Sequence, residues 1–316
     1  MDLDAYFAEN PQMADAGVPA APEGFRSGFI ALVGRPNAGK STLMNALVGQ
    51  KVAITSATPQ TTRRNVQGVL TLPACQMVFV DTPGLHKPHD LLGEHLNGSA
   101  EAALKDVDVV AMLVDSTKPV GRGDAWVAEH VAASPAKKML VLSKHDLATA
   151  DQTAAQFEAA RGLAPWDAVV SLSAKTGYNA NAFLEEAEML LPEGPLWYPK
   201  GMVSDLGTEM MIAESVREKV LRSFRDEVPH SVGVKVDALE EAPRLLRAEA
   251  TVYVERESQK AMLIGAKGAS IKRIGTEARK DMERAFGIKC YLGLKVKVKK
   301  NWRKDESEIQ RLGYTE

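Results

Sequence analysis

The hydrophobic residues in the first two-thirds of the chain form short, continuous runs, separated by segments with helical spacing. Continuous runs are typical of strands that are buried on both faces, because a strand with one solvated face would have alternating apolar and polar residues. The segment at 92–106 is one example of the helical spacing between the runs. This alternation predicts an α/β domain with a doubly wound, mostly parallel sheet. Its strands are expected at 28–34, 76–84, 108–116, 137–146 and 168–177.

The pattern changes after a Pro- and Gly-rich stretch at 191–201. Apolar residues recur at helical spacing over 206–227 and predict one long helix. Two strands with alternating hydropathy follow, then a helix–loop–helix segment over 261–287, a strand and a short helix. These strands are expected at 231–239, 246–256 and 292–300, and the last helix at 301–313.

Length and pattern together predict two domains in the 316 residues. Residues 1–26 are acidic, contain Pro and Ala, and are expected to form a flexible tail. The α/β domain is predicted at 27–192, a linker at 193–204, and an α+β domain with a basic C-terminal extension at 205–316.

Composition excludes several classes of protein. The two cysteines, Cys75 and Cys290, lie far apart in the sequence, so neither a disulfide framework nor a zinc site is expected. No apolar stretch approaches the ~18 residues of a membrane-spanning helix. The N-terminus lacks the basic and apolar regions of a secretory signal. Composition therefore favours a soluble protein whose two thiols are free, as in a reducing cytoplasm.

The formal net charge of −2 conceals an asymmetry. Residues 251–316 contain 16 Lys and Arg against 9 Asp and Glu, a net charge of +7, so the first 250 residues carry −9. A charged run is usually a solvated face, but residues 258–304 contain 14 Lys and Arg against only 3 Asp and Glu, and they surround a glycine-containing loop. The asymmetry favours a polyanionic partner for the second domain.

A glycine-rich loop follows the first predicted strand and precedes a predicted helix. Its sequence, GRPNAGKST, fits G-x-x-x-x-G-K-[ST], in which backbone amides surround phosphates. Lys40 should reach the β- and γ-phosphate oxygens, Ser41 should bind Mg²⁺, and the helix dipole adds positive potential. Nucleotide contacts are expected at Gly34, Arg35, Pro36, Asn37, Ala38, Gly39, Lys40, Ser41 and Thr42.

Three further motifs, DTPG (81–84), SKHD (143–146) and SAK (173–175), follow the ends of predicted strands, and the last two point to guanine. In DTPG, Asp81 can hold Mg²⁺ through water and the amide of Gly84 can sense the γ-phosphate. In SKHD, the Asp146 carboxylate can accept from the guanine N1–H and amino group, a donor pair that adenine lacks. In this order the motifs resemble translation-factor-type GTPases. Further nucleotide contacts are expected at Thr61, Thr82, Pro83, Ser143, Lys144, Ser173, Ala174 and Lys175.

Ser143 departs from the base-reading motif of that class, which usually has Asn-Lys-x-Asp. The Asn usually braces the phosphate loop and contacts the purine N7, and a shorter serine can do only part of this. Because Lys144 and Asp146 are retained, we expect weaker nucleotide affinity but the same guanine specificity.

The polar segment at 54–65 is predicted to be a mobile switch. In GTPases of this class such a segment supplies a threonine to Mg²⁺ and the γ-phosphate; Thr62 is favoured here, and Thr61 is not excluded. Leu85 stands where Ras-like proteins place a glutamine that orients water, so hydrolysis is expected to be slow. The predicted catalytic residues are Lys40, Thr62, Asp81 and Gly84, and the predicted metal ligands are Ser41, Thr62 and Asp81. Asn37 matches an Asn that binds K⁺ in similar potassium-dependent GTPases, which gives the hypothesis of potassium stimulation.

The second domain contains IGAKGASI within its basic helix–loop–helix segment. A Gly-x-x-Gly sequence is by itself usually a plain turn. Here the order helix–strand–strand–helix–helix–strand matches a type II KH domain, in which this loop clamps about four nucleotides of single-stranded RNA. RNA contacts are expected at Ile264, Gly265, Ala266, Lys267, Gly268, Ile271, Lys272 and Arg273.

From about residue 28 to residue 315, the chain resembles the Era family of bacterial GTPases. The resemblance rests on GRPNAGKST, ITSATPQTTR, DTPGLH, SAKTG, VYVERESQK, IGAKGASIKRIGTEARKDME and LKVKVKKNWR. It implies a slow GTP-hydrolysing switch with Mg²⁺. It further implies binding to the single-stranded 3′-end region of small-subunit (16S) ribosomal RNA, a role in assembly of the 30S subunit, and peripheral association with the inner membrane.

Three alternatives remain open at this point. One is an RNA-binding adapter with little or no GTPase activity, although Lys40, Ser41, Asp81 and Asp146 are intact. Another is a tRNA-modification GTPase, which shares Asn37 but needs catalytic domains that this chain lacks. The third is a membrane-surface role for the basic segment, which lacks an amphipathic face with Trp anchors.

Overall fold

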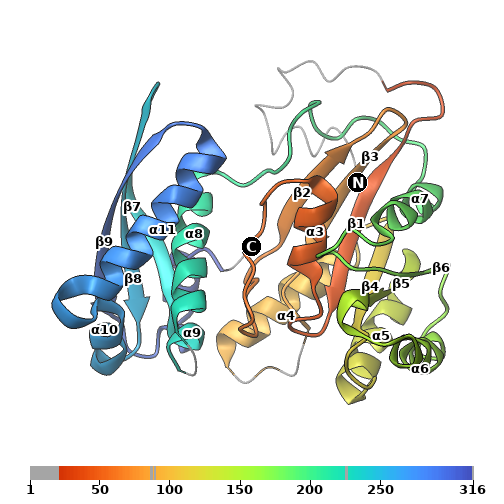
Figure 1. Ribbon diagram of the computed structural model, residues 1–316, viewed down its shortest axis with the longest axis horizontal. Helices are drawn as coiled ribbons and strands as arrows, with labels where there is room; N and C mark the ends of the chain where they lie inside the picture. The colour runs from red at the N-terminus through yellow and green to blue at the C-terminus, as the bar shows by residue number, and fades with distance from the viewer. Residues whose placement is uncertain (1–20, 86–87, 89, 225–226, 315–316) are drawn as a thin grey trace. The chain divides into compact units, whose positions relative to one another are not determined.

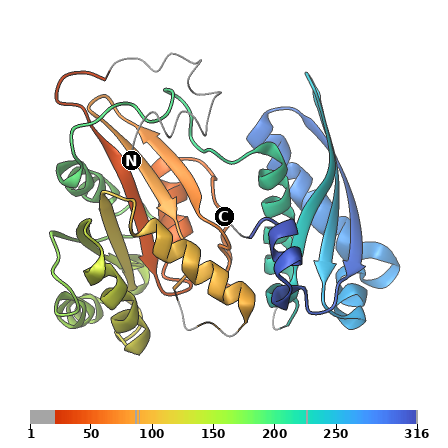
Figure 2. The ribbon, with the colours of Figure 1, turned by 180° about the vertical axis from the view of Figure 1, so that it is seen from behind.

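The computed structural model describes residues 21–85, 88, 90–224 and 227–314, and the predicted tail at 1–26 lies mostly outside them. The chain divides into two compact units. The first unit is drawn from Met1–Ala53, Arg64–His86 and Asn97–Asp205, and the second from Ile54–Arg63, Lys87–Leu96 and Leu206–Glu316. Figures 1 and 2 show the chain from opposite sides.

The first unit contains a six-stranded sheet in the order β2-β3-β1-β4-β5-β6. All neighbouring strands are parallel except β2 and β3, which confirms the predicted doubly wound, mostly parallel sheet. The antiparallel edge strand β2 was not predicted. The strands are β1 (Arg26–Gly34), β2 (Val66–Thr71), β3 (Cys75–Asp81), β4 (Val109–Asp115), β5 (Lys137–Ser143) and β6 (Ala168–Ser171).

Helices cover both faces of this sheet (Figure 1). One face packs against α4, α5 and α6 through a cluster that includes Ala31, Val33, Val127 and Ala160. On the other face lie α3 and α7, with Phe183 of α7 against Phe79 at a ring distance of 6.2 Å. The helices are α3 (Lys40–Val48), α4 (Leu91–Ala103), α5 (Arg122–Ala133), the short 3₁₀ turn η1 (His145–Leu147), α6 (Ala150–Arg161) and α7 (Ala180–Leu190).

The segment predicted to be a linker packs against the sheet of the first unit. The Gln76 side-chain oxygen accepts from the amides of Trp197 and Tyr198 at 2.7 and 2.9 Å, and Tyr198 is buried. Ser204 forms an isolated bridge with Gly68 of β2. Residues 193–204 therefore belong to the first unit.

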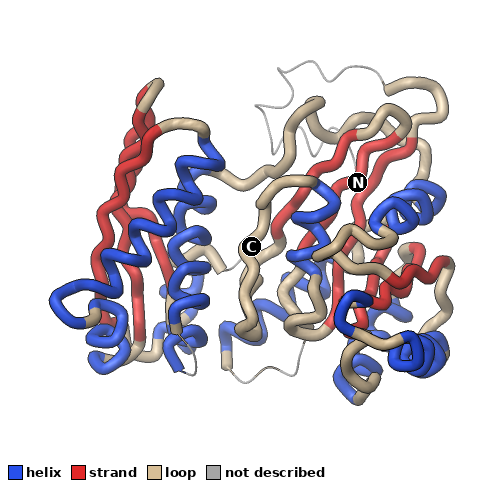
Figure 3. The backbone as a smooth tube through the Cα atoms, viewed as in Figure 1, coloured by secondary structure: helices blue, strands red, loops and turns tan. Residues whose placement is uncertain are grey.

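The second unit has a three-stranded sheet in the order β7-β8-β9, with β7 antiparallel and β9 parallel to β8. The helices α8 and α11 pack on one face (Figure 3). Val216, Val252 and Ile274 are fully buried there. Trp302 and Ile309, near the C-terminus, cluster with Tyr253 of β8. The elements are α8 (Thr208–Ser223), α9 (Glu227–Ser231), β7 (Gly233–Ala242), β8 (Leu245–Val254), α10 (Glu257–Ile264), η2 (Ala266–Gly268), α11 (Ala269–Phe286), β9 (Lys289–Val298), η3 (Trp302–Lys304) and α12 (Glu306–Arg311).

The predicted switch segment contributes Ile54–Arg63 to the second unit. The Glu218 carboxylate accepts from the Thr55 amide at 3.0 Å, and Arg217 donates to the Thr61 carbonyl. The Arg63 guanidinium is buried and donates to the Val232 carbonyl at 2.6 Å. Burial lowers the pKa of Arg63, partly offset by Tyr314.

Candidate nucleotide site and RNA-binding loop

The phosphate loop joins the buried strand β1 to α3. Gly34 has φ +148°, and a Cβ at that position would lie 2.6 Å from the Leu113 carbonyl oxygen. Gly39 has φ +104° and directly precedes the first residue of α3. Both glycines are therefore required by the loop's backbone, which supports the motif assignment.

Lys40 is buried at the base of this loop, with 6% of its surface exposed. Its Nζ donates to the Gly34 and Arg35 carbonyls at 3.3 and 3.4 Å. Burial lowers the pKa of Lys40, and the nearby Asp81 carboxylate opposes this effect. An ammonium held by two long hydrogen bonds to neutral carbonyls is suited to a phosphate, which is a stronger acceptor.

Ser41 and Asp81 meet beside Lys40. The Ser41 hydroxyl donates to the Asp81 carboxylate at 2.5 Å, and Asp81 is fully buried. Hydroxyl and carboxylate oxygens are ligands that Mg²⁺ prefers, so these two residues fit the ion. In the described part of the chain, no group of three or more His, Cys, Asp or Glu side chains could hold a metal. A Mg²⁺ here would need further oxygen ligands, which nucleotide phosphates, water and the predicted Thr62 hydroxyl would supply.

The DTPG turn packs closely against the phosphate loop. A Cβ on Gly84 would lie 2.9 Å from the Pro36 backbone nitrogen and Cα, so the approach needs glycine. The Thr82 hydroxyl donates to the Leu32 carbonyl at 2.9 Å, which anchors the turn to β1. Leu85 is 1% exposed and packs in the core, consistent with its inability to orient a water molecule.

Ser143 braces the phosphate loop directly. Its hydroxyl lies 2.7 Å from the Ala38 carbonyl and 3.1 Å from the Val114 carbonyl, and the residue is 3% exposed. The serine therefore braces the phosphate loop at Ala38, which is one of the two roles expected of the usual Asn.

The SKHD and SAK motifs come together at the ends of β5 and β6. The Ser173 hydroxyl donates to the Asp146 carboxylate at 2.7 Å, and Asp146 is exposed. The His145 and Tyr178 rings stack with their centroids 4.5 Å apart, which is a second contact between the two loops. An oriented, accessible carboxylate is what guanine recognition requires.

Lys144 is fixed by a residue that the sequence analysis did not identify. Its Nζ lies 2.7 Å from Asp115, at the end of β4. Burial tends to raise the pKa of Asp115, but hydrogen bonds from Lys144 and Thr117 outweigh it and hold the pKa below its usual value. Its position at a strand's C-terminal end is the signal that could have identified Asp115.

Thr61 and Thr62 belong to the second unit, whereas the phosphate loop belongs to the first. The Thr61 hydroxyl is 2.6 Å from the Thr58 carbonyl and 2.7 Å from the Ser56 hydroxyl, within its own segment. Both threonines are nearly buried there. Their contact with Mg²⁺ and the γ-phosphate stays a prediction.

The Gly-x-x-Gly loop joins α10 to α11 as predicted. Gly265 and Gly268 have φ of +70° and +78°, and a Cβ on Gly265 would lie 2.8 Å from the Ser270 Cβ. Lys267 is exposed, and its φ of 50° is also in the left-handed region. One turn further, α11 presents exposed Lys272 and Arg273, whereas Ile264 and Ile271 are half-buried. The loop thus presents exposed cations on a closely turned backbone.

The Ser143 brace gives a testable prediction. Ser143→Ala removes a buried hydroxyl donor and leaves the Ala38 carbonyl without it, at a cost of about 1–3 kcal/mol. We expect GDP affinity to fall about tenfold, measured by titration with a fluorescent GDP analogue. Ser134→Ala is a matched control, because Ser134 is also buried and donates to the Leu104 carbonyl at 2.7 Å, away from the loop. Equal GDP affinity in the two variants would contradict a specific bracing role.

Two sequence families match the chain. Residues 29–144 match the family described as 50S ribosome-binding GTPase, and residues 227–303 match the KH domain family. Fold and site thus define a P-loop GTPase joined to a C-terminal KH domain.

Similarity to whole proteins is more specific. The chain is 43% identical over 293 residues to GTPase Era of Caldicellulosiruptor saccharolyticus, which covers 92% of this chain and 98% of the relative. It is 44% identical over 296 residues to GTPase Era of Mycobacterium avium, covering 92% and 99%. The chain belongs to the Era family of GTPases.

Solved structures agree with this assignment. Era of Aquifex aeolicus, as a variant bound to GDP·AlF4⁻, matches with a TM-score of 0.89 and 33% identity, over 92% of this chain and all of that one. A structure of Era in complex with MgGDPNP and nucleotides 1506–1542 of 16S ribosomal RNA matches with the same score, identity and coverage. The resemblance inferred from the motifs is thereby confirmed.

Proposed function

We propose that this protein is a GTP-operated switch that binds the single-stranded 3′-end region of 16S ribosomal RNA and assists assembly of the 30S subunit. The observation that carries the proposal is that one chain contains both an exposed carboxylate oriented by Ser173, that of Asp146, and an exposed Gly-x-x-Gly loop. Its similarity to an Era that was solved with MgGDPNP and this RNA supports the choice of partner.

The nucleotide would be GTP or GDP with Mg²⁺. Lys40 would exchange its carbonyl partners for β- and γ-phosphate oxygens, and the Gly84 amide would bond the γ-phosphate. Ser41 and Asp81 would hold Mg²⁺, with Thr62 as a further predicted ligand. The ion would neutralise phosphate charge when bound. Asp146 would accept from guanine N1–H and the amino group.

Potassium stimulation is a separate part of the proposal. Asn37 lies in the phosphate loop with φ 65°. A K⁺ held by its side chain would place positive charge where other GTPases use an arginine finger. We expect faster hydrolysis in KCl than in NaCl at matched ionic strength, measured as phosphate release. Asn37→Ala should remove the difference, and equal rates for the unaltered protein would contradict the hypothesis.

RNA binding would follow from the KH fold and its charge. Gly265 and Gly268 would admit the RNA backbone, and Lys267, Lys272 and Arg273 would contact phosphates. Direct titration of an RNA carrying the 16S 3′-end sequence, against a shuffled RNA of equal length, tests the proposal. We expect preference for the native sequence and an affinity that falls steeply with salt. Equal binding of the two RNAs would contradict the proposed partner.

An RNA-binding adapter without hydrolysis is the second candidate. Its motivation is the serine at position 143, but the Ser143 contact with the Ala38 carbonyl favours a working site. Steady-state GTP turnover with and without RNA separates the two functions, because the adapter predicts none in either condition.

The cellular location and the oligomeric state form the last part of the proposal. In the described residues, no helix is long and apolar enough to cross a membrane. We place the protein in the cytoplasm as a monomer with peripheral contact to the inner membrane, on the family resemblance. Mass measurement in solution and sedimentation with anionic vesicles test these two points.

A further inference from the structure

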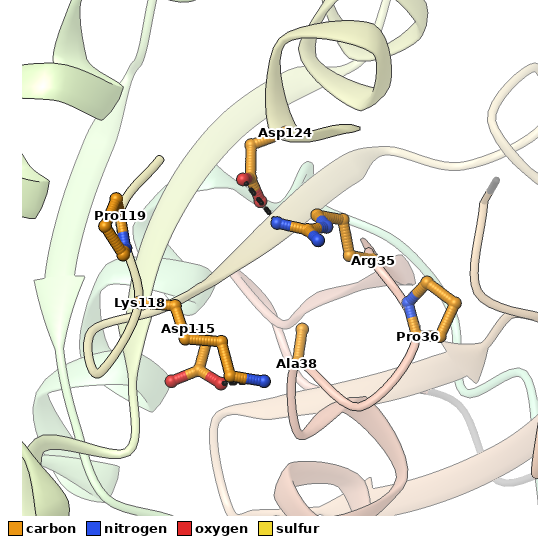
Figure 4. Close-up of a pocket in the computed structure, with 7 residues that line it drawn as sticks. All are labelled: Arg35, Pro36, Ala38, Asp115, Lys118, Pro119 and Asp124. Atoms are coloured by element: carbon orange, nitrogen blue, oxygen red, sulfur yellow. Dashed lines mark hydrogen bonds and ion pairs between the residues drawn. The ribbon is translucent and has the colours of Figure 1, made fainter. Parts of the chain in front are cut away.

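The side chain of Arg35 extends from the phosphate loop toward α5. Its Nη1 lies 3.1 Å from the Asp124 carboxylate, which is in the first turn of that helix (Figure 4). The Arg35 side chain is 45% exposed, whereas that of Asp124 is only 6% exposed. The phosphate loop is thus tied to a helix that contributes none of its predicted nucleotide contacts.

The first turn of α5 leaves room for the Arg35 side chain. A Cβ on Gly123 would lie 3.0 Å from the Arg35 Nε and 3.2 Å from its Cδ, so glycine permits the contact. The same Asp124 oxygen accepts from the Gly121 amide at 3.0 Å, at the start of α5. The Gly121 amide therefore holds the Asp124 side chain in place independently of Arg35. Forming the ion pair then costs little additional conformational entropy at Asp124.

The backbone of Arg35 lies in the half of the phosphate loop that is expected to face the γ-phosphate. Its carbonyl and that of Gly34 accept from Lys40 Nζ, and Pro36 packs against Gly84, the predicted γ-phosphate sensor. The other half of the loop is held differently, through the Ala38 carbonyl and Ser143. The two halves of the phosphate loop thus have separate anchors.

We propose that Arg35 and Asp124 are positioning residues for GTP hydrolysis, which hold the γ-phosphate half of the loop in place. Neither side chain needs to touch the nucleotide. The proposal rests on the GTPase reaction of the family and is independent of the RNA partner proposed above.

The size of the effect is limited by hydration. The pair borders a pocket of about 40 Å³, with room for about one water molecule. A partly hydrated ion pair contributes less than a dry one. We expect a fall in kcat of about fivefold, equivalent to about 1 kcal/mol at 1.36 kcal/mol per factor of ten.

A double-mutant cycle in the full chain tests the proposal. Arg35→Ala and Asp124→Asn should each lower kcat about fivefold while GDP affinity, held by the Ser143 half, changes less than about twofold. Asn at position 124 can still accept from the Gly121 amide. The double variant should be no slower than Arg35→Ala alone, because the ion pair is already lost in each single variant. Arg35→Lys should recover part of the rate.

Lys137→Ala is the matched control. Lys137 pairs with Asp167 at 3.0 Å, at the opposite end of the same sheet, and its loss should leave kcat unchanged. Additive rate losses in the double variant would overturn the proposal. The proposal would also be overturned if the loss of kcat were fully explained by lower GDP affinity and a lower melting temperature. That result would indicate a general destabilisation of the fold. Failure of RNA binding would bear only on the proposed function, because neither residue belongs to the RNA-binding unit.

Discussion

Gly268→Asp is expected to abolish RNA binding and to leave GDP binding unchanged. Gly268 has φ +78° and ends the Gly-x-x-Gly loop directly before α11. An aspartate there would put a negative side chain where the RNA phosphates approach most closely. We expect at least a hundredfold loss of RNA affinity, a change of about 2.8 kcal/mol at 1.4 kcal/mol per factor of ten, measured by titration of the 16S 3′-end RNA.

Gly287→Asp provides a matched control for this variant. Gly287 follows the other end of α11, with φ +69°, and a Cβ there also meets nothing within 4 Å. The two variants therefore share the strain of a left-handed residue and the added charge. Equal loss of RNA affinity in both would show that strain or net charge, rather than the loop, is responsible. Loss of GDP binding in Gly268→Asp would contradict the separation of the two sites.

Lys40→Ala is expected to lower GTP affinity on the order of a hundredfold and to stop hydrolysis. Lys40 is the buried cation of the phosphate loop, and a charge-assisted hydrogen bond is worth about 1.5–3 kcal/mol. Its removal leaves the loop's amides in place, so residual binding is expected. Fluorescent nucleotide titration and phosphate release measure the two effects.

An exposed lysine of the same unit serves as the control for Lys40. Lys105→Ala removes the same charge at a position away from the loop and should change neither quantity. RNA binding by Lys40→Ala without nucleotide should match that of the unaltered protein without nucleotide. A near-normal turnover in Lys40→Ala would contradict the assignment of the catalytic site.

The predicted fold was recoverable because its signals are local. Continuous apolar runs identified β1, β3, β4, β5 and β6, and the glycines of both loops are required by their own backbone conformations. The strand β2 was missed because Gln67, Gly68 and Thr71 interrupt its apolar pattern, and its identity depends on pairing with β3.

Contacts between distant residues were beyond reach from the sequence. The packing of the predicted linker depends on Gln76, more than 100 positions from Tyr198. The Arg35 contact with Asp124 spans 89 positions and carries no motif. The bracing by Ser143 likewise depends on where its hydroxyl lies in the fold. The sequence shows that a serine replaces the usual Asn, but it does not show that this serine still contacts the Ala38 carbonyl of the phosphate loop.

If the GTP state of this protein acts on the 3′ end of 16S ribosomal RNA, its contacts with that RNA must change with the bound nucleotide. Crosslinking of the protein to RNA in cell extracts, followed by sequencing, measures these contacts with a non-hydrolysable GTP analogue and with GDP. We expect crosslinks concentrated at the 16S 3′ end, with different yields for the two nucleotides and none for Gly268→Asp. Crosslinks spread over other RNAs, or yields identical with both nucleotides, would contradict it.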